Sequence, residues 1–311
     1  MSTLQIQLLG GFQLHLDDAP VTTVNQTRQQ ALLAYLLLHR YAPQLRQHLA
    51  FLFWPDTSEP QAHTNLRQLL YHLRRAWPTV SDFLQIEART IQWKPEATFT
   101  LDIMTFEQAL AQAAAAMHAA QLEAARTALT QAIDLYGGDL LPGCYEEWLL
   151  SERERLRQRF LDALEQLVVL YERQREYLTA IHYAQRLLRT DPLHETTYRR
   201  LMRLYALNGD RASALRTYHV CATNLERELD VEPNQETQDA YARLLRMEIP
   251  LVLGAATVAR TAAGERLIGR QPAWETLQAA WQMAMHGRAR FVYIRGEAGI
   301  GKTRLAEELL H

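Results

Sequence analysis

The chain has 311 residues and a formal net charge of −2, so its overall charge gives no indication of a nucleic-acid partner. With 48% hydrophobic and 22% charged residues, the composition is that of globular domains, and the length suggests two or three of them. The two cysteines lie far apart in sequence, which argues against a disulfide framework or a zinc site and favours a cytoplasmic location. The N-terminus lacks a signal-peptide pattern, and the longest apolar stretch, 249–259, is too short to span a bilayer, so we expect no membrane association.

The first predicted element is a β-hairpin. Apolar and polar residues alternate through LQIQLLGGFQLHL, residues 4–16, and Gly10-Gly11 separates the two runs. Alternation of this kind is typical of strands that bury one face. The residues expected on the buried face are Leu4, Ile6, Leu8, Phe12, Leu14 and Leu16.

Three helices are predicted next, over residues 27–40, 46–56 and 59–78. A second alternating segment, 83–95, turns near Ala88-Arg89 and predicts another hairpin. The order hairpin, three helices, hairpin is that of a winged helix, which is a variant of the helix-turn-helix.

The third predicted helix has two very different sides. Its leucines and Trp77 recur at spacings of three and four, which buries one stripe. The opposite side is polar and basic, and no acidic residue occurs between Pro60 and Trp77. A helix that enters the major groove needs such a side, because polar side chains read base edges and cations contact phosphates. The candidate DNA-binding residues on this helix are His63, Thr64, Arg67, Gln68, Tyr71, Arg74 and Arg75.

These candidates divide by their place on the helix. Arg67 and Gln68 lie in the middle of the polar side and are our candidates for contacts to base edges. The candidates for phosphate contacts, which include two residues of the second hairpin or wing, are Arg74, Arg75, Arg89 and Lys94. The alternative is an amphipathic helix whose arginines only solvate one face and complement the helix dipole.

Residues 105–247 show helical patterns and no strand signal. An alanine-rich segment, 106–136, predicts two helices, GGDLLPG at 137–143 interrupts the chain, and 145–176 predicts one long helix. The pairs of similar positions that follow are separated by 34 residues, and they are Tyr171 with Tyr205, Tyr177 with Arg211, and Ala180 with Ala214. A 34-residue period of helix pairs is the signature of tetratricopeptide repeats, whose concave surface binds peptides or helices.

The end of the chain carries a phosphate-binding loop. RGEAGIGKTRL follows a short apolar run, 291–294, and precedes a segment of helical composition, which is the strand–loop–helix context of a P-loop. Backbone N–H groups of such a loop surround phosphates, while Lys302 would reach the β- and γ-phosphates and Thr303 would bind Mg²⁺. The candidate nucleotide-binding residues are Gly296, Gly299, Gly301, Lys302 and Thr303. The alternative is a glycine-rich turn with a chance lysine.

ATP hydrolysis needs more than this loop. A second strand must supply an acidic residue for the metal, and another group must orient the attacking water. We find neither of these after Thr303, and we find no catalytic base, nucleophile or metal cluster before residue 290. We therefore expect the chain to be no enzyme but to carry the opening of a larger ATPase, and we expect ATP and Mg²⁺ to be cofactors of a longer parent protein.

Several separated motifs resemble one family of bacterial transcriptional activators, the SARP family. LLGGFQL, RQQALLAYLLLHR, LAFLFWPD and NLRQLLYHLRRAW resemble its OmpR-type winged helix. YEEWLLSERERLR and RTDPLHETTYRRLMRLYALNGD resemble the bacterial transcriptional activation domain that follows it. LIGR at 267–270, followed by the P-loop, is similar to the start of AAA-like or STAND-type ATPases, and large SARP proteins join the three parts in this order.

The resemblance implies a mostly α-helical, multidomain protein. A winged helix-turn-helix of mixed α+β class precedes an all-α domain of tetratricopeptide-like repeats and an incomplete P-loop α/β fragment. The expected ranges are 1–102 for the winged helix, 103–248 for the activation domain, 249–266 for a linker and 267–311 for the ATPase fragment.

The resemblance also implies a function. It predicts sequence-specific binding to double-stranded DNA, usually at direct repeats by two or more protomers, with contact to RNA polymerase and nucleotide-controlled activity in the parent protein. The helical repeats would bind protein partners. The alternative is a signalling scaffold in which the repeats bind a protein and the winged helix has no affinity for DNA. A third reading, a complete nucleotide-dependent enzyme, is disfavoured by the missing ATPase elements.

Overall fold

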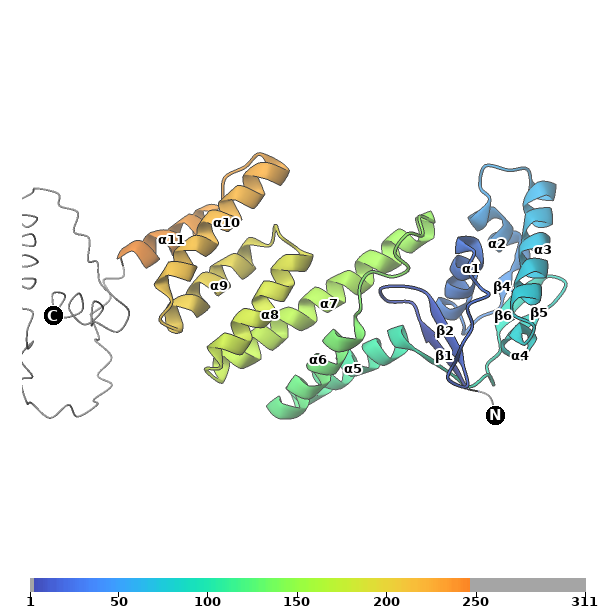
Figure 1. Cartoon of the computed structure of the whole chain (residues 1–311), viewed down its shortest axis with the longest axis horizontal. Coiled ribbons are helices and arrows are strands. Elements are labelled where there is room, and N and C mark those ends of the chain that lie inside the picture. Colours follow the sequence, from blue (N-terminus) through green and yellow to red (C-terminus); the bar gives the residue numbers. More distant parts are fainter. Residues whose placement is uncertain (1–2, 247–311) are drawn as a thin grey trace, which may run out of the picture. The chain divides into compact units, whose positions relative to one another are not determined.

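The computed structural model describes residues 3–246, which fall within one compact unit, Met1–Glu248. A second unit, Ile249–His311, lies outside the described residues. Figure 1 shows the described part as a small α+β domain at the N-terminus followed by helices only. Within residues 3–246, no helix is both long enough and apolar enough to cross a lipid bilayer.

The predicted first hairpin is present and belongs to a larger sheet. Strands β1 (Leu4–Gln7) and β2 (Gln13–Leu16) pair antiparallel, and β3 (Ala19–Pro20) extends the sheet beyond β2. On the other side of β1 lies β7 (Phe99–Leu101), in parallel, so the order is β3-β2-β1-β7. Of the six residues expected on the buried face, Phe12 and Leu16 are partly exposed and the other four are buried.

The three predicted helices and the wing are also present. They are α1 (Thr27–Leu38), α2 (Arg46–Phe53) and α3 (Glu59–Ala76), followed by a short helix α4 (Val80–Phe83). The wing consists of β5 (Leu84–Ile86) and β6 (Thr90–Trp93), and the two-residue strand β4 (Gln44–Leu45) pairs with β6 to give the order β4-β6-β5. The wing strands therefore hold the start of α2 in place.

Helix α1 is buried on every side. Leu33, Ala34 and Leu37 are as inaccessible as Leu32 and Leu36. A helix that is apolar all round must be covered all round. The cover on one side comes from the winged helix itself. On another side, Trp148 from the helical domain packs edge-on against Tyr35, with ring centroids 5.1 Å apart.

Seven helices form the rest of the described chain. Their bounds are α5 (Asp102–His118), α6 (Leu122–Leu135), α7 (Glu147–Arg173), α8 (Tyr177–Thr190), α9 (Glu195–Leu207), α10 (Arg211–Leu229) and α11 (Gln235–Arg246). Consecutive helices pack against one another, so each buries the apolar stripe of its neighbour.

The 34-residue period corresponds to pairs of helices. Tyr177 and Arg211 are the first residues of α8 and α10, and Ala180 and Ala214 are fully buried at the same place on those two helices. The two copies differ in the length of their second helix, since α10 has 19 residues where α8 has 14. Helices α7 and α9 are thus the first helices of successive pairs, and α11 occupies that place in the next pair.

The winged helix and the helical domain share one core. The backbone of Leu8–Gly10 meets that of Asp139–Leu141: Leu9 and Leu140 form an antiparallel bridge, Gly10 N donates to Asp139 O at 3.0 Å, and Leu141 N donates to Leu8 O at 2.9 Å. The Asp102 carboxylate accepts hydrogen bonds from the N–H groups of Leu8 and Leu9 at 2.8 and 2.7 Å. We call these contacts, together with Tyr35 and Trp148, the junction.

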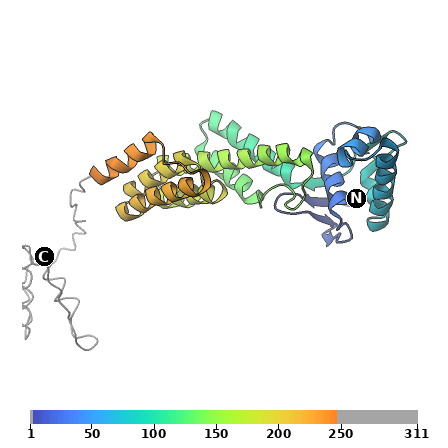
Figure 2. The same ribbon diagram turned by 90° about the horizontal axis from the view of Figure 1, so that it is seen from above.

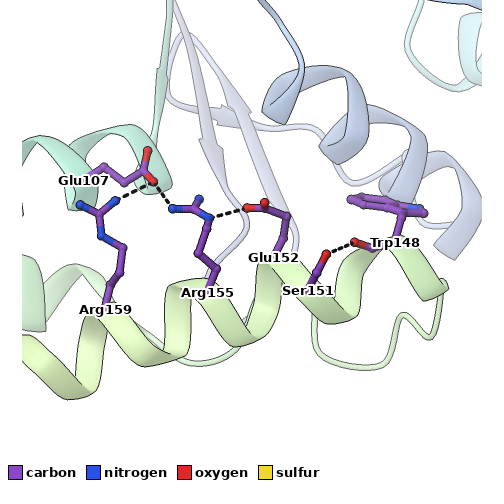
Figure 3. Close-up of polar contacts among 6 residues, drawn as sticks. All are labelled: Glu107, Trp148, Ser151, Glu152, Arg155 and Arg159. Carbon is purple, nitrogen blue, oxygen red and sulfur yellow. Dashed lines mark hydrogen bonds and ion pairs between the residues drawn. The ribbon is translucent and has the colours of Figure 1, made fainter.

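Figure 3 shows the start of α7, which lies beside this junction. The Trp148 ring points toward the helices of the winged helix, while Arg155 and Arg159, about two and three turns further along α7, reach Glu107 of α5. Arg155 also pairs with Glu152. Polar groups therefore tie α5 to α7 next to the apolar contacts that tie α7 to α1.

Candidate nucleic-acid interface

Helix α3 owes its position to a buried stripe of apolar side chains. Ser58 precedes the helix in extended conformation, Pro60 lies in its first turn and Pro78 follows its end, so both ends are set locally. The side chains that anchor it in the core are Ala62, Leu66, Leu69, Leu70 and Leu73. Figures 1 and 2 show α3 on the side of the winged helix that faces away from α5–α11.

The polar side of α3 is open to solvent. Arg67, Gln68, Tyr71, Arg74 and Arg75 are exposed. This is the surface that the sequence predicted as the reading face. The helical repeats do not cover it in the described part of the chain.

The N-terminal half of this surface is ordered by contacts along the helix. His63 and Thr64 are half-exposed. Arg67 donates from Nε to the carbonyl oxygen of His63 at 3.3 Å and from Nη2 to Thr64 Oγ1 at 3.2 Å. Thr64 Oγ1 in turn donates to the Pro60 carbonyl at 2.9 Å. These bonds are exposed, so a ligand with better acceptors can replace them at small cost.

A groove of about 640 Å³ lies where α3, the start of α2 and the tip of the wing meet. It brings together three of the residues predicted from sequence, His63, Arg67 and Arg89, although Arg89 is 22 positions or more from the other two. The other residues that line it are Leu45, Arg46, Gln47, Glu59 and Ala88.

Arg46 is the residue that the sequence reasoning missed. It is the first residue of α2, its N–H donates to the Arg89 carbonyl at 2.9 Å, and its guanidinium donates to the Glu87 carbonyl at 3.2 Å. Burial, followed by the positive charges of Arg67 and Arg74, lowers the pKa of Arg46. The guanidinium stays charged, and the part of the shift that comes from Arg67 and Arg74 reflects their positive charges nearby.

A signal for Arg46 was present in the sequence. A cation at the first position of a helix opposes the helix dipole, and no acidic residue in the first turn of α2 compensates it. An anion supplied from outside would offset this unfavourable arrangement. The N–H groups at a helix start favour the same kind of ligand.

Glu59 is the one carboxylate among the described residues that line this groove. Its Oε1 accepts a hydrogen bond from Gln47 Nε2 at 2.9 Å and lies 3.8 Å from His63 Nε2. It complements the positive end of the α3 dipole and leaves the arginines in excess.

The structure separates Lys94 from the other candidates. It follows the last residue of β6, at the end of the wing hairpin opposite to the tip, and its N–H donates to the Phe83 carbonyl at 2.8 Å. Its side chain is half-buried. Gln68, Tyr71, Arg74 and Arg75 share the exposed side of α3 without lining the groove.

The predicted nucleotide-binding residues Gly296, Gly299, Gly301, Lys302 and Thr303 lie outside the described residues, as does the predicted linker 249–266. Within residues 3–246, no cluster of His, Cys, Asp and Glu side chains has the geometry to hold a metal ion.

Comparison with protein families assigns the two parts that follow the winged helix. The model of the bacterial transcriptional activator domain matches residues 101–245, and that of an AAA ATPase domain matches residues 266–311. The second match covers the P-loop motif.

Two curated relatives match along most of the chain. The chain is 27% identical to Regulatory protein AfsR of Streptomyces coelicolor over 94% of its own length, and 26% identical to Regulatory protein AfsR of Streptomyces griseus over 91%. These alignments cover 31% and 30% of the relatives, so the chain spans less than a third of their length.

A solved structure, that of Mycobacterium tuberculosis EmbR in complex with a low-affinity phosphopeptide, shares the fold. The TM-score is 0.64 at 21% sequence identity, and the match covers 79% of this chain and 66% of that chain. The predicted fold class, a small N-terminal winged-helix-like domain followed by helical repeats in a mostly helical chain, is confirmed.

The resemblance seen in the sequence motifs is therefore also confirmed. Residues 101–245 match the model of the bacterial transcriptional activator domain, and together with the match to the start of an AAA ATPase domain this domain content is consistent with a SARP-type regulator.

Proposed function

We propose that this chain is the DNA-binding part of a transcriptional regulator, most simply an activator, and that α3 inserts its exposed side into the major groove. The observation that carries the proposal is the groove at the start of α2, which Arg46, Arg67 and Arg89 line from α2, α3 and the wing, with Glu59 the one carboxylate among the described lining residues. Phosphate is the ligand that such a cluster favours, because guanidinium groups bind phosphate oxygens through paired hydrogen bonds.

The contacts divide into two classes. Arg67 and Gln68 reach base edges, since they lie in the middle of the exposed side of α3. Arg46, Arg74, Arg75 and Arg89 bind phosphates on either side, and the N–H groups at the start of α2 add to the phosphate site. His63, Thr64 and Tyr71 support the placement of α3 along the major groove. Lys94 contacts the DNA backbone only if the base of the wing also approaches the DNA.

The relatives support a regulatory role, because both carry the name regulatory protein and both align with the whole N-terminal arrangement. On this basis we further propose direct-repeat operators bound by two or more protomers, and a contact with RNA polymerase. Gly296, Gly299, Gly301, Lys302 and Thr303 would hold ATP and Mg²⁺ in a protein that carries the whole ATPase domain, where nucleotide state would control the activity.

The test is binding of the 311-residue chain to genomic DNA fragments, followed by footprinting of the retained sequence and by two variants. Arg67→Ala should cost about 1–3 kcal/mol on the preferred site and relax sequence preference there. Arg74→Ala should weaken binding to all sequences alike and lower the salt dependence of the affinity by about one phosphate contact.

A matched control is Arg173→Ala, which removes the same charge from an exposed position at the end of α7. It should leave DNA affinity unchanged within experimental error. The DNA-binding proposal fails if the chain shows no affinity for duplex DNA at low salt, or if all three variants behave alike. The scaffold reading, with a winged helix that does not bind DNA, would then hold.

The nucleotide proposal has its own test. In a protein that contains the complete ATPase domain, Lys302→Ala should abolish binding of a fluorescent ATP analogue, because the lysine supplies the charge at the β- and γ-phosphates. DNA binding by the winged helix should persist in that variant. Unchanged nucleotide affinity would contradict the assignment of the P-loop.

A further inference from the structure

A second groove, of about 570 Å³, runs between α9 and α11 at the far end of the described helices from the winged helix. Both helices are the first members of successive repeat pairs, and they pack against each other. The side chains that line the groove from α9 are Thr196, Arg199, Arg200, Met202, Arg203, Ala206 and Leu207, and those from α11 are Ala240, Arg243 and Leu244.

The groove has an apolar floor and cationic walls. Met202 and Leu244 are buried at its base, while Leu207 is half-exposed at its edge. Four arginines line it, and among the described residues no carboxylate does. On α9 the arginines recur at positions 199, 200 and 203, so helical spacing brings all three to one side.

The arginines differ in how firmly they are held. Arg199 is fixed by Glu236 at 2.8 Å and by Thr237 Oγ1 at 3.1 Å, and Arg200 pairs with Glu165 of α7 at 3.2 Å. Arg203 contacts Glu172 of α7 at 2.9 Å, yet 71% of its side chain remains exposed. Arg243 is exposed, and within residues 3–246 no carboxylate lies within ion-pair distance of it.

We propose that this groove binds an acidic peptide segment of a partner protein, with an apolar side chain of the peptide on the Met202–Leu244 floor. Arg203 and Arg243 line the groove from α9 and α11 and have unused N–H donors, because a guanidinium has five and the ion pair of Arg203 with Glu172 is not a hydrogen bond. Carboxylates are the complementary groups. The apolar floor adds the desolvated anchor that exposed ion pairs alone do not provide.

The charge balance favours a peptide over a nucleic acid. Three glutamates, Glu165, Glu172 and Glu236, already compensate three of the four arginines, so the groove carries one positive charge in excess. A nucleic acid gains affinity in proportion to the number of its phosphates that are neutralised. One excess positive charge therefore contributes little affinity for a nucleic acid. An acidic side chain beside an apolar one matches both the excess charge and the floor.

This inference goes beyond the proposed DNA binding and does not depend on it. The probe is a fluorescein-labelled peptide in which a Leu-Phe pair is flanked by glutamates, and the measurement is fluorescence anisotropy with the 311-residue chain. Arg203→Glu and Arg243→Glu should each weaken binding by roughly tenfold, since charge reversal removes an attraction and adds a repulsion. Leu207→Ser, and an otherwise equal probe with alanines in place of Leu-Phe, should weaken it as well.

The matched control is Arg227→Glu on α10, which changes the same charge at a side chain that is 64% exposed and does not line the groove. It should bind the probe within about twofold of the unaltered chain. Circular dichroism of each variant identifies any loss of folding, and Leu207→Ser, which changes no charge, keeps the test valid if an arginine variant unfolds.

Three results would overturn the proposal. They are absence of binding to the unaltered chain, an equal loss in Arg227→Glu, and displacement of the probe by duplex DNA together with reduced DNA affinity in Arg243→Glu. The last result would assign the groove to nucleic acid. Because neither Arg203 nor Arg243 belongs to the α3 surface, unchanged DNA affinity in these variants separates failure at this groove from failure of the proposed DNA binding.

Discussion

The winged helix has two faces that differ in how their polar groups are satisfied. On the α3 face, Arg46, Arg67, Arg74, Arg75 and Arg89 make no ion pair with any described residue. At the junction, by contrast, the backbone groups of Leu8–Gly10 are paired within the protein and the aromatic rings of Tyr35 and Trp148 are packed together. The arginines of the α3 face are therefore available to a ligand, whereas the polar groups of the junction are already paired with the helical domain.

The arginines of the helical domain sharpen this contrast. Most of them between α6 and α10 have a glutamate or aspartate within 4 Å, and several of the pairs connect a helix to the next but one. The same residue type therefore has two uses in one chain. The presence of a carboxylate partner distinguishes a cation that holds helices together from one that is available to a ligand.

The largest expected effect is at the junction. Gly10 has φ +79°, and a Cβ at this position would lie 2.7 Å from the carbonyl oxygen of Gly137 in the other domain. Gly10→Ala should therefore lower the free energy of unfolding by about 2–4 kcal/mol, through backbone strain and the clash together. Urea unfolding measures this loss.

Gly11→Ala is the matched control for that variant. A Cβ at Gly11 meets no atom within 4 Å, so the substitution should change stability by no more than about 0.5 kcal/mol. Equal stabilities of the two variants would show that the loop of Leu8–Gly10 does not depend on its contact with Gly137.

The second effect concerns the α3 face. If Arg46, Arg74, Arg75 and Arg89 each neutralise one phosphate, raising the salt concentration from about 50 to about 200 mM should weaken DNA binding by about a hundredfold. The junction should respond little, because its contacts are backbone hydrogen bonds and apolar packing. DNA affinity and thermal unfolding measured in the same buffers compare the two faces directly. A DNA affinity that does not change with salt concentration would contradict the assignment of these arginines to phosphates.

A smaller effect is expected for the paired arginines beside the junction. Glu107 accepts from Arg155 at 2.8 Å and from Arg159 at 3.1 Å, as Figure 3 shows, and all three side chains are partly exposed. Glu107→Gln should cost about 0.5 kcal/mol, since exposed ion pairs contribute little. A double-mutant cycle with Arg159→Ala measures the coupling, and a coupling several times larger would mean that this pair is a main support of the junction.

The smallest effect is a pH dependence at Asp102. Burial raises its pKa above the ordinary 3.8, although hydrogen bonds from the N–H groups of Leu9, Leu8 and Ile103 lower it. The folded chain then binds the carboxyl proton of Asp102 more tightly than the unfolded chain does. The stability that this proton contributes is fully present below the ordinary pKa and is lost as pH rises through the raised value. As the pH rises from below the ordinary pKa through the raised one, Asp102→Asn should gain stability relative to the natural chain. A constant difference in urea midpoint would contradict this.

Local patterns predicted the elements of the winged helix well. The spacing of Leu66, Leu70 and Leu73 predicted which side of α3 is buried, and the period of 34 placed the starts of α8 and α10. Both follow from the geometry of one helix or one helix pair.

Contacts between distant segments could not be predicted from the sequence. Nothing in Phe99–Leu101 identifies it as a parallel partner of β1, and nothing near Tyr35 in the sequence indicates that Trp148 packs against it. Arg46 could have been noticed as an unfavourable residue at a helix start, but its proximity to Arg67 and Arg89 depends on the pairing of β4 with β6.

Strand β7 ends at Leu101 and α5 begins at Asp102, with no linker between the sheet and the helices. If α3 binds a duplex, the helices α7–α11 and any protein bound to them are then held at a fixed angle around the axis of that duplex. Inserting about five base pairs, half a helical turn, between operator and promoter would carry it to the opposite side, and about ten would bring it back. Promoter output should accordingly oscillate with spacer length, because the continuous strand and helix give the regulator no joint with which to compensate.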